Sequence, residues 1–449
     1  MLEKTLELIS SKSYLVEVFG LGYVGFPLAV RLANGGIKVR GIDINPKRIK
    51  RLKNNELLDS ELYLKNEFQH CRNNHNLELE GFPSKSENPK IGIICVHTPI
   101  PDKNTSSNKF VIEAVNSFLE TSKSGDIIIL ESSVGGGTTE DVKDIIESSA
   151  YKVGIDFGLC FCPERIDPLN KKWNLENIPR IIYCSDDISF KISEKIYKHV
   201  NNAHLHRVSS SKIAEVVKSY ENAFRLVNIS LVNELAILCD KLKINVSDVI
   251  KAASTKPFGF MPFYPSAGAG GHCIPKDPRF LLDAAKKFNM NFSTIENALN
   301  VNFEIPKYIC NKIEKKLAGK KLEKSVLVCG LTYKPNVEDM RDSPGFKIIK
   351  EFNNKKFKVL IYDPFFKEEL IEKYLKENFL DKLDFEYKKG LDDETLKKVS
   401  CLCIVQHHTK SKFRLMEIYE KSLVPYIYDC QNNIDVINES KTELDSLGR

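Results

Sequence analysis

A cysteine near the middle of the chain stands in a setting suited to covalent chemistry. Cys273 belongs to the stretch AGAGGHCIPKDP, in which small residues precede it and a lysine and an aspartate follow it. Glycine-rich backbone adopts conformations closed to other residues and leaves room for another group to lie against it. The thiolate is the nucleophilic form of cysteine, and His272 or Lys276 would favour that form. Its neighbours therefore distinguish Cys273 from the other cysteines of the chain.

A long helix with a polar stripe is predicted at residues 211–242, which contain neither glycine nor proline. Its apolar surface is wide enough to pack on two sides, which indicates a helix that links domains or forms a dimer. At about 100° per residue, five polar side chains fall within an arc of about 80°. Such a stripe faces either a polar ligand or solvent. Its members are Glu215, Lys218, Asn222, Arg225 and Asn233.

The sequence GLGYVG near the N-terminus matches a dinucleotide-binding fingerprint. It follows a strand-like run, Leu15–Phe19, and precedes helix-compatible residues and a second strand that ends at Asp43. In this context Gly20 makes a tight turn, Gly22 lets a pyrophosphate approach the backbone, and Gly25 allows close packing of helix on strand. The helix N-terminus would supply N–H groups to the phosphates.

A carboxylate at position 43 selects the cofactor. Asp43 would accept hydrogen bonds from the ribose hydroxyls and repel a 2′-phosphate, which favours NAD over NADP, although Arg48 weakens this preference. Thr98 and Ser133 follow further strand-like runs and are candidate contacts, but either hydroxyl could instead cap a turn. The expected cofactor residues are Gly20, Gly22, Tyr23, Val24, Gly25, Asp43, Arg48, Thr98 and Ser133.

A second strand, loop, helix and strand pattern begins at Lys324. Its first turn, GLTYK, lacks the three-glycine fingerprint, so a second dinucleotide site is not expected. Lys334 and Arg341 on the connecting loop suit a different phosphate-bearing ligand, or are surface charges. The polar segment ESKTELDSLGR at the end of the chain is expected to fray.

Size and composition indicate a multidomain cytoplasmic protein. The 449 residues suggest two or three domains, and 66 basic against 60 acidic side chains, spread along the chain, disfavour a nucleic-acid partner. No run approaches the roughly 20 apolar residues that span a bilayer, and a signal-peptide core is lacking, so no membrane insertion is expected. Twelve cysteines without C-x-x-C spacing predict no metal site. The strand-like settings of Cys160, Cys162, Cys401 and Cys403 indicate buried thiols.

Seven segments in order resemble the UDP-glucose/GDP-mannose dehydrogenase family: GLGYVG, CVHTP, ESSVGGGTT, CPERIDP, AEVVKSYENAFR, GAGGHCIPKDP and LTYKPNVEDMRDSP. The resemblance implies an α/β fold with two Rossmann-like parallel-sheet domains joined by a helical central domain. The expected ranges are 1–210 for the NAD-binding domain, 211–318 for the central dimerisation and catalytic domain, and 319–449 for the UDP-binding domain. The family oxidises the C6 alcohol of a UDP-sugar to a carboxylate with two NAD⁺, and a homodimer is implied.

The family's catalytic residues map onto this chain one by one. Cys273 matches the nucleophile that captures the C6 aldehyde and becomes a thioester. Lys218 matches the lysine that stabilises oxyanions, and Asn222 the residue that orients the oxygen. Asp277 matches the aspartate that works with the lysine on proton transfer, and Glu164 the glutamate implicated in thioester hydrolysis.

The resemblance also implies substrate contacts and shows departures. Members commonly have prolines where this chain has Gly135-Gly136, a P-G-P-G loop where it has Ser266-Ala267, and an arginine where it has Gln431. These departures leave the loop shapes and any contact of residue 431 open. The implied substrate contacts are Arg165, Ile166, Arg225, Tyr333, Lys334 and Arg341.

The sequence indicates a class of UDP-sugar substrate rather than a single sugar. The segments PER at 163–165 and TKPFGFMPFYP at 255–265 are more similar to the UDP-N-acetylhexosamine dehydrogenases than to the UDP-glucose enzymes. UDP-N-acetylglucosamine is favoured, with UDP-N-acetylmannosamine, UDP-N-acetylgalactosamine and UDP-glucose as alternatives. A non-catalytic nucleotide-sugar sensor and a hydroxyacid dehydrogenase that uses one NAD⁺ per product are the other classes considered.

Overall fold

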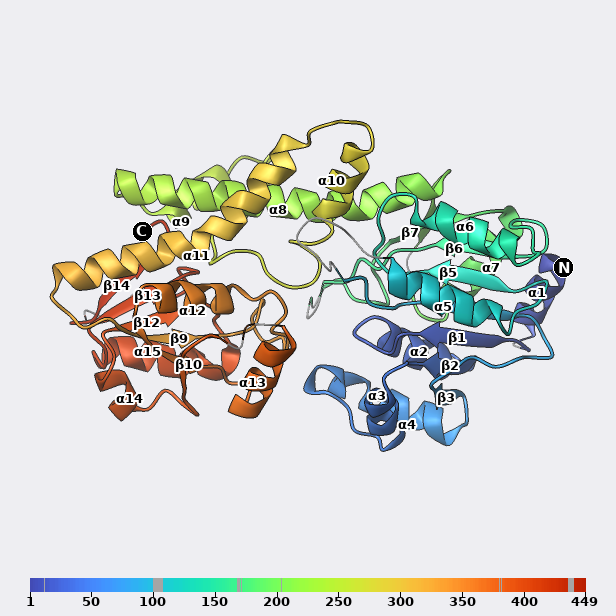
Figure 1. The fold of residues 1–449 in the computed structure, drawn as a ribbon, viewed down its shortest axis with the longest axis horizontal. Helices are drawn as coiled ribbons and strands as arrows, with labels where there is room; N and C mark the ends of the chain where they lie inside the picture. The colour runs from blue at the N-terminus through green and yellow to red at the C-terminus, as the bar shows by residue number, and fades with distance from the viewer. Residues whose placement is uncertain are drawn as a thin grey trace. The chain divides into compact units, whose positions relative to one another are not determined.

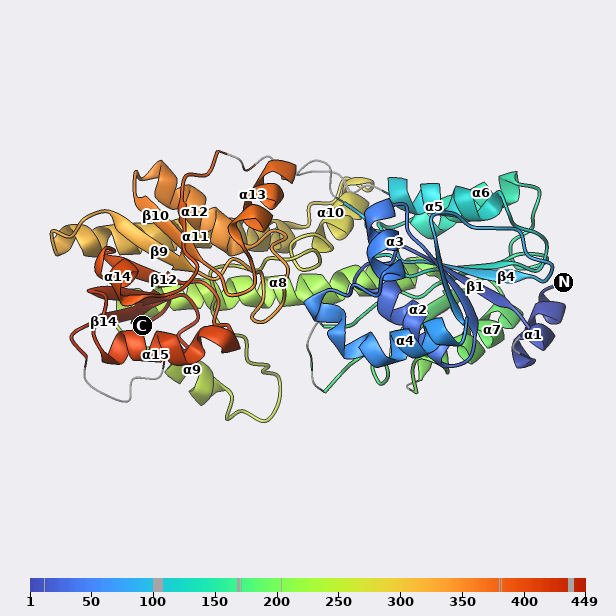
Figure 2. The same cartoon turned by 90° about the horizontal axis from the view of Figure 1, so that it is seen from below.

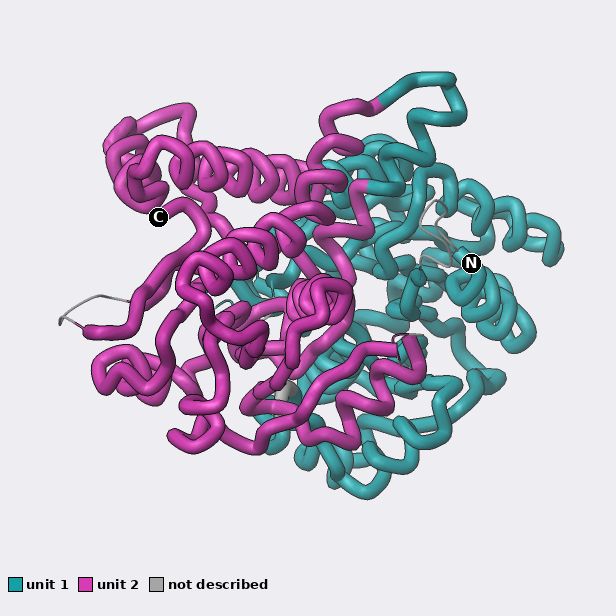
Figure 3. Tube along the Cα trace, turned by 60° about the vertical axis from the view of Figure 1, so that its left-hand side comes forward, with its two compact units in different colours: residues 1–221, 279–291 teal, residues 222–278, 292–449 magenta. Residues whose placement is uncertain are grey.

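The computed structural model describes the chain except residues 12, 100–107, 168–169, 171, 203, 379, 381 and 435–439. The described residues form two compact units, which Figure 3 distinguishes by colour: residues 1–221 with 279–291, and residues 222–278 with 292–449. Each unit contains one mainly parallel sheet (Figure 1), which confirms the expected α/β class with two Rossmann-like domains and a helical segment between them in the chain. The three expected domain ranges stay a prediction.

The sheet of the first unit has eight strands in the order β3-β2-β1-β4-β5-β6-β7-β8. Neighbouring strands run parallel except β6 and β7, which are antiparallel. This reversal brings the start of β7 to the edge of the sheet where β6 ends. The strands are β1 Leu15–Phe19, β2 Lys38–Ile42, β3 Leu77–Glu80, β4 Lys90–Ile94, β5 Ile127–Leu130, β6 Gly158–Phe161, β7 Arg180–Cys184 and β8 Leu205–Arg207.

Helices cover both faces of this sheet, as the edge-on view in Figure 2 shows. In β5, Ile127 and Ile129 join the core on one face, and Ile128 and Leu130 join the core on the other. Such continuous apolar strands are typical of sheets buried on both sides. One face carries α1 Leu2–Ser10, α2 Gly25–Asn34, α3 Pro46–Lys53, α4 Lys65–Asn73 and α7 Asp187–Tyr197, and the other carries α5 Lys109–Leu119 and α6 Thr138–Ser148.

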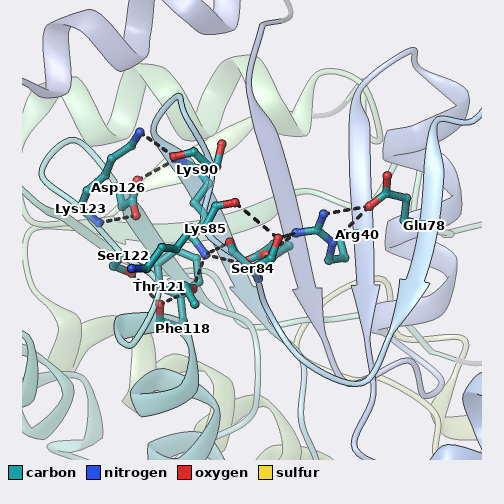
Figure 4. A network of polar contacts seen from close by, with 12 residues as sticks. Arg40, Glu78, Ser84, Lys85, Lys90, Phe118, Thr121, Ser122, Lys123 and Asp126 are labelled. Carbon is teal, nitrogen blue, oxygen red and sulfur yellow. Dashed lines mark hydrogen bonds and ion pairs between the residues drawn. The ribbon is translucent and has the colours of Figure 1, made fainter.

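A polar network lies near the amino ends of these strands (Figure 4). The Lys90 Nζ is 2.8 Å from Glu17 Oε2, and Arg40 pairs with the same glutamate at 3.1 Å. Asp126 accepts the backbone N–H groups of Lys90 at 2.8 Å and Lys123 at 2.9 Å. Because a sheet of this kind binds its ligand at the carboxyl ends of the strands, this network belongs to stability rather than to the site.

The long helix is present with the predicted bounds, α8 Ser211–Leu242. Among the described residues it is the one helix long and apolar enough to cross a membrane, and the core helix of a soluble protein meets the same criterion. Of its most apolar 18-residue window, 44% is buried. The neighbouring helices of the chain are α9 Val246–Ala253, α10 Pro278–Lys286 and α11 Ser293–Gly319. The exposed large apolar side chains of α8 are Ile213, Val216, Tyr220, Phe224, Leu231, Leu238 and Leu242.

The sheet of the second unit has the order β11-β10-β9-β12-β13-β14. Helices α11, α12 Pro344–Asn354 and α13 Glu368–Glu377 contribute to the core on one face, and α14 Asp393–Lys397 and α15 Lys412–Glu420 to the core on the other. The strands are β9 Ser325–Cys329, β10 Lys358–Tyr362, β11 Glu386–Tyr387, β12 Cys401–Ile404, β13 Tyr426–Asp429 and β14 Glu443–Ser446.

The expectation that the chain end frays is wrong. Residues 443–446 form β14, which pairs in parallel with β13. Leu447 is fully buried, and Asp240 accepts the N–H groups of Gly448 at 3.2 Å and Arg449 at 3.1 Å. A strand this short and polar carries no clear periodic signal, because its stability comes from pairing with a distant strand. The burial predicted for the thiols of Cys160, Cys162, Cys401 and Cys403 is confirmed.

Candidate active site

The fingerprint turn between β1 and α2 is closed on its protein side and open at Gly22. Gly20 has a φ of 86°, and a Cβ there would lie 2.8 Å from the Cys95 carbonyl oxygen. A Cβ on Gly25 would lie 2.0 Å from the carbonyl oxygen of Gly20, whereas one on Gly22 would meet no atom within 4 Å. The first and third glycines are therefore required by packing, and the second leaves space for a ligand.

Asp43 lies directly after β2 and beside this turn. Its Oδ2 accepts the Leu21 N–H at 2.9 Å and its Oδ1 accepts the Asn45 N–H at 2.8 Å, so the carboxylate is fixed with further lone pairs available. Arg48 donates from Nε to the Leu21 carbonyl at 2.9 Å and forms an ion pair with Glu61. The positive charge of Arg48 is thus balanced within the protein, a partner that sequence reasoning missed.

The two candidate hydroxyl residues lie at neighbouring strand ends. Thr98 follows β4, is buried and donates from Oγ1 to the Ser133 carbonyl oxygen at 2.8 Å. Tyr23 is exposed and Val24 is half-buried at the turn. All the residues that the sequence predicted for a cofactor therefore lie in the first unit, in segments that follow β1, β2, β4 and β5.

Cys273 is exposed, whereas the other eleven cysteines, all within the described residues, are buried or half-buried. Its carbonyl oxygen accepts the N–H groups of Lys276 at 3.2 Å and Asp277 at 2.8 Å, which forms a helical turn ahead of α10. Asp277 is fully buried, its Oδ2 accepts Nδ2 of Asn222 at 2.7 Å, and its Oδ1 lies 3.4 Å from the Lys276 Nζ. Three predicted catalytic residues, Cys273, Asn222 and Asp277, are thus neighbours in the second unit.

The glycines ahead of Cys273 make room for protein, which corrects the expectation that they make room for the ligand. A Cβ on Gly270 would lie 2.5 Å from the Asp342 carbonyl oxygen. A Cβ on Gly271, whose φ is 81°, would lie 2.7 Å from the ring of Tyr333. The Gly271 N–H also donates to the Arg341 carbonyl at 3.0 Å. These glycines therefore dock the Cys273 loop onto the segment that follows β9.

Arg341 on that segment lies within electrostatic range of Cys273. Its guanidinium binds Asp339, with Nε 3.0 Å from Oδ1 and Nη2 2.6 Å from Oδ2. Neighbouring protein atoms partly desolvate the guanidinium, which opposes its charged form, although 45% of the side chain is exposed. The pKa of Arg341 is nevertheless raised by Asp339 and, to a smaller extent, by Tyr333 and Cys273. The sequence did not predict this electrostatic interaction between a cation and the thiol of Cys273. Lys334, half-buried, belongs to the same loop.

Three members of the polar stripe on α8, Glu215, Asn222 and Asn233, bind protein groups, a third environment beside the polar ligand or solvent that the sequence left open. Glu215 is buried and accepts the N–H groups of Gly137 at 2.7 Å and Thr139 at 2.9 Å, at the N-terminus of α6. Asn233 accepts the Ser266 N–H at 3.0 Å and so supports the loop that leads to Cys273. On α8, Lys218 is half-buried and lies one turn before Asn222. Arg225 is exposed.

The departures from the family pattern have local structural partners. Gln431 donates from Nε2 to Gln406 Oε1 at 3.0 Å, and Gln406 donates from Nε2 to the Tyr333 carbonyl at 3.1 Å. Gln431 therefore supports the loop that contacts Gly271. Ala267, the second member of the Ser266-Ala267 departure, belongs to the core of the second unit.

Glu164 follows β6 and is buried. Its Oε1 accepts the N–H groups of Arg165 at 2.5 Å and Ile166 at 2.7 Å, and its Oε2 lies 3.1 Å from Nη2 of Arg180. The side chain of Arg165 forms an ion pair with Glu221. Sequence reasoning missed Arg180, although an arginine at the start of the apolar run RIIYC was a usable signal.

The predicted site residues fall in both units. The fingerprint turn, Glu164 and Lys218 belong to the first, and Cys273 with its buried partners belongs to the second. No group of three or more His, Cys, Asp or Glu side chains that could hold a metal occurs in the part of the chain that the structure describes. A dinucleotide turn and an exposed thiol, each on a Rossmann-like framework, define the class of protein as a nucleotide-dependent oxidoreductase.

Comparison with known families places the chain within that class. It belongs to the UDP-glucose/GDP-mannose dehydrogenase family: the NAD binding domain matches residues 14–201, the central domain 212–304 and the UDP binding domain 327–436. The chain is therefore an NAD-dependent UDP-sugar dehydrogenase, as the sequence resemblance indicated.

Alignments with known UDP-sugar dehydrogenases cover most of the chain. A UDP-N-acetyl-D-mannosamine dehydrogenase of Methanococcus vannielii is 34% identical over 90% of this chain and 89% of its own length. A UDP-N-acetyl-D-glucosamine 6-dehydrogenase of Pseudomonas aeruginosa is 32% identical over 79% of this chain and 83% of its own. The solved structure of the UDP-D-ManNAc dehydrogenase of Pyrococcus horikoshii matches with a TM-score of 0.84 and 27% identity, covering 97% of this chain and 99% of that one.

Proposed function

We propose that this chain oxidises the C6 alcohol of a UDP-N-acetylhexosamine to the uronate in two hydride transfers, with Cys273 as the nucleophile. The observation that carries the proposal is the exposure of this one thiol beside the buried Asn222–Asp277 pair. Cysteine captures an aldehyde as a thiohemiacetal, which keeps the reactive intermediate bound between the two oxidations. The neighbouring charge of Arg341 favours the thiolate.

The remaining steps are assigned to the chain's own side chains. Lys218, with Asp277, would take up the proton of the C6 hydroxyl and stabilise the oxyanion, and Asn222 would orient that oxygen. Loss of a second hydride turns the thiohemiacetal into a thioester on Cys273. Glu164 would then activate the water that releases the acid.

The first unit is suited to NAD rather than NADP. NAD⁺ would supply the hydride acceptor, with its pyrophosphate beside the open face of Gly22 and its ribose near Asp43. Because Glu61 balances the charge of Arg48, that arginine offers little attraction to a 2′-phosphate. Thr98 and Ser133 complete the proposed cofactor contacts.

The substrate class rests on sequence and on relatives. The names of the relatives include both UDP-N-acetylmannosamine and UDP-N-acetylglucosamine dehydrogenases, and their identities of 34% and 32% do not separate the two sugars. The TKPFGF segment at 255–260 favours UDP-N-acetylglucosamine. Arg165, Ile166, Arg225, Tyr333, Lys334 and Arg341 are the proposed substrate contacts.

A homodimer through α8 accounts for the apolar side chains on this helix. At about 100° per residue, the seven exposed ones fall within an arc of about 80°, which is a continuous stripe suited to a second copy of the same helix. Leu231→Glu should lower the mass measured by light scattering from dimer to monomer. Phe413→Glu, on the exposed surface of α15, is the matched control and should leave the mass unchanged.

The proposed chemistry is tested by NADH stoichiometry. We expect two NADH per UDP-sugar consumed, with the highest kcat/KM for a UDP-N-acetylhexosamine in a panel that includes UDP-glucose. Cys273→Ser should abolish formation of the acid, while Cys71→Ser, which replaces a fully buried thiol in the first unit, should retain it. Unchanged acid production by Cys273→Ser, or one NADH per product, would reject the proposal.

A further inference from the structure

A single buried arginine is shared by two carboxylates in the first unit. Nη2 of Arg180, whose side chain is 1% exposed, lies 2.7 Å from Glu131 Oε2 and 3.1 Å from Glu164 Oε2. Tyr197 donates its hydroxyl to Glu131, and its ring centroid lies 4.6 Å from the guanidinium carbon. Within the described part of the chain, Nε and Nη1 of Arg180 have no hydrogen-bond partner. The arginine therefore balances its charge chiefly through the two glutamates.

The antiparallel strand explains how this arginine reaches the carboxyl edge of a parallel sheet. Glu131 directly follows β5, and Glu164 lies in the loop after β6. Arg180 is the first residue of β7, which runs opposite to β6, so the start of β7 lies beside the ends of those two strands. Because ligands of such sheets bind at the carboxyl ends of the strands, this ion cluster lies at the functional edge.

The cluster holds more negative than positive charge. Burial raises the pKa of Glu131, Arg180 lowers it, and the neighbouring Glu164 raises it. Burial also raises the pKa of the two nearby thiols, Cys95 well above its usual value and Cys162 to about 12, so neither adds charge near neutral pH. One cation is therefore divided between two carboxylates, of which only Glu164 is partly exposed, at 10% of its side chain.

We propose that Arg180 and Glu131 are positioning residues that orient Glu164 and set its proton affinity for hydrolysis of the Cys273 thioester. The inference rests on the proposed function. In that step the oxygen of water bonds to the acyl carbon, a proton of the water passes to Glu164, and the carbon–sulfur bond breaks to leave the thiolate. Hydrolysis needs no oxidant or reductant.

The geometry supports both the proposed orientation of Glu164 and the proposed effect on its proton affinity. Glu164 is held at Oε1 by the N–H groups of Arg165 and Ile166, and its Oε2 lies 3.1 Å from Nη2 of Arg180 in an ion pair without hydrogen-bond geometry. A carboxylate paired alone with a guanidinium is a poor base because the cation stabilises its charged form. Glu131 takes part of that cation's charge and adds its own repulsion to the negative charge of Glu164.

The test is the pH dependence of thioester decay, measured by rapid quench and intact-protein mass after one turnover with excess NAD⁺. Glu131→Gln leaves Arg180 paired with Glu164 alone. The acid limb of the plot of decay rate against pH should therefore move to lower pH by about one unit or more. Arg180→Gln removes the cation and should move the limb to higher pH. Arg180→Lys retains the charge and should lie closer to wild type, and KM should change little in each variant.

Arg31→Gln is the matched control, because Arg31 also bridges two glutamates, Glu67 at 2.9 Å and Glu176 at 2.7 Å, on the surface of the same unit. It should leave the acid limb in place. If Arg180→Gln does not fold, Glu131→Gln and Arg180→Lys decide the question. An acid limb that stays in place in Glu131→Gln would overturn the inference.

Glu164→Gln separates this inference from the proposed function. It should accumulate the thioester on Cys273 after release of two NADH per site. Absence of that adduct would reject the proposed function, and the inference with it. An adduct in Glu164→Gln, together with unshifted limbs or shifts of the same sign in the Glu131 and Arg180 variants, would leave the function standing and reject the role assigned to these two residues.

Discussion

The fingerprint turn allows stability and cofactor affinity to be separated with two single-methyl substitutions. Gly25→Ala would place a Cβ 2.0 Å from the Gly20 carbonyl oxygen, a contact that only a backbone shift can relieve. Overpacking of this kind costs about 1–3 kcal/mol or more. Gly22→Ala meets no protein atom within 4 Å, so its effect on the free energy of unfolding should stay within about 0.5 kcal/mol.

The effects of the two substitutions on the affinity for NAD⁺ should be opposite to their effects on stability. The methyl of Gly22→Ala occupies the space through which a pyrophosphate reaches the backbone N–H groups. Loss of one hydrogen bond to a charged group is worth about 1.5–3 kcal/mol, which corresponds to about a 10- to 100-fold increase in Kd. For Gly25→Ala, a loss of 1–3 kcal/mol lowers Tm by several degrees, at about 2–4 °C per kcal/mol for a domain of this size.

Thermal unfolding without ligand and calorimetric titration with NAD⁺ measure the two effects separately. Gly319→Ala, whose Cβ also meets nothing within 4 Å but which lies at the end of α11, is the control and should change neither Tm nor Kd appreciably. Wild-type affinity in Gly22→Ala would refute the placement of the pyrophosphate at this turn. Wild-type Tm in Gly25→Ala would refute the steric reasoning.

Three further predictions concern stability. Glu215→Ala strands the N–H groups at the start of α6 and should cost about 2–4 kcal/mol in chemical denaturation, whereas the exposed Glu234→Ala should cost little. Burial raises the pKa of Asp126 from 3.8 to about 6, so the folded state binds this proton more tightly than the unfolded state does. The resulting stabilisation of the folded state, about 3 kcal/mol, is complete below about pH 4 and is lost as pH rises through 6. Asp126→Asn should therefore flatten the dependence of the free energy of unfolding on pH. Deletion of residues 443–449 removes β14 and buried Leu447 and should lower Tm by several degrees, whereas a frayed end would leave Tm unchanged.

The features that sequence predicted well depend on residues close together in the chain. The fingerprint glycines, the strands beside them and the bounds of α8 follow from local spacing and from apolar periodicity. That Asn222 and Asp277 are site residues stays a prediction, made only through resemblance to a family. That they form a hydrogen bond across 55 positions of sequence is information that the structure adds.

The features that sequence missed depend on distant partners. The space beside Gly271 is filled by Tyr333, and the cation beside Cys273 is Arg341, both more than sixty positions later. Nothing near Arg180 in the chain indicates that Glu131 and Glu164 will surround it, because the antiparallel turn of β7 brings them together. Patterns of residue type predict which elements form, but they do not predict which charges those elements bring into contact.

The two sheets share the geometry around their first two strands. Both have the same strand order over six strands, and in both the residue after the first strand's glycine donates its N–H to an aspartate after the second strand: Leu21 to Asp43 at 2.9 Å, and Leu331 to Asp363 at 2.6 Å.

The two aspartates differ in what else surrounds them. Asp363 is buried and lies 3.3 Å from Nε2 of His408. The Nδ1 of His408 accepts the Asn336 N–H at 3.0 Å, so Nε2 carries the hydrogen, and Nε2 also lies 3.4 Å from Thr332 Oγ1. Asp43 has no such imidazole among its described partners and stands beside the open face of Gly22. That the second turn binds no dinucleotide stays a prediction, and two features favour it: the carboxylate that would meet a ribose is buried beside a histidine, and the turn lacks the second and third glycines.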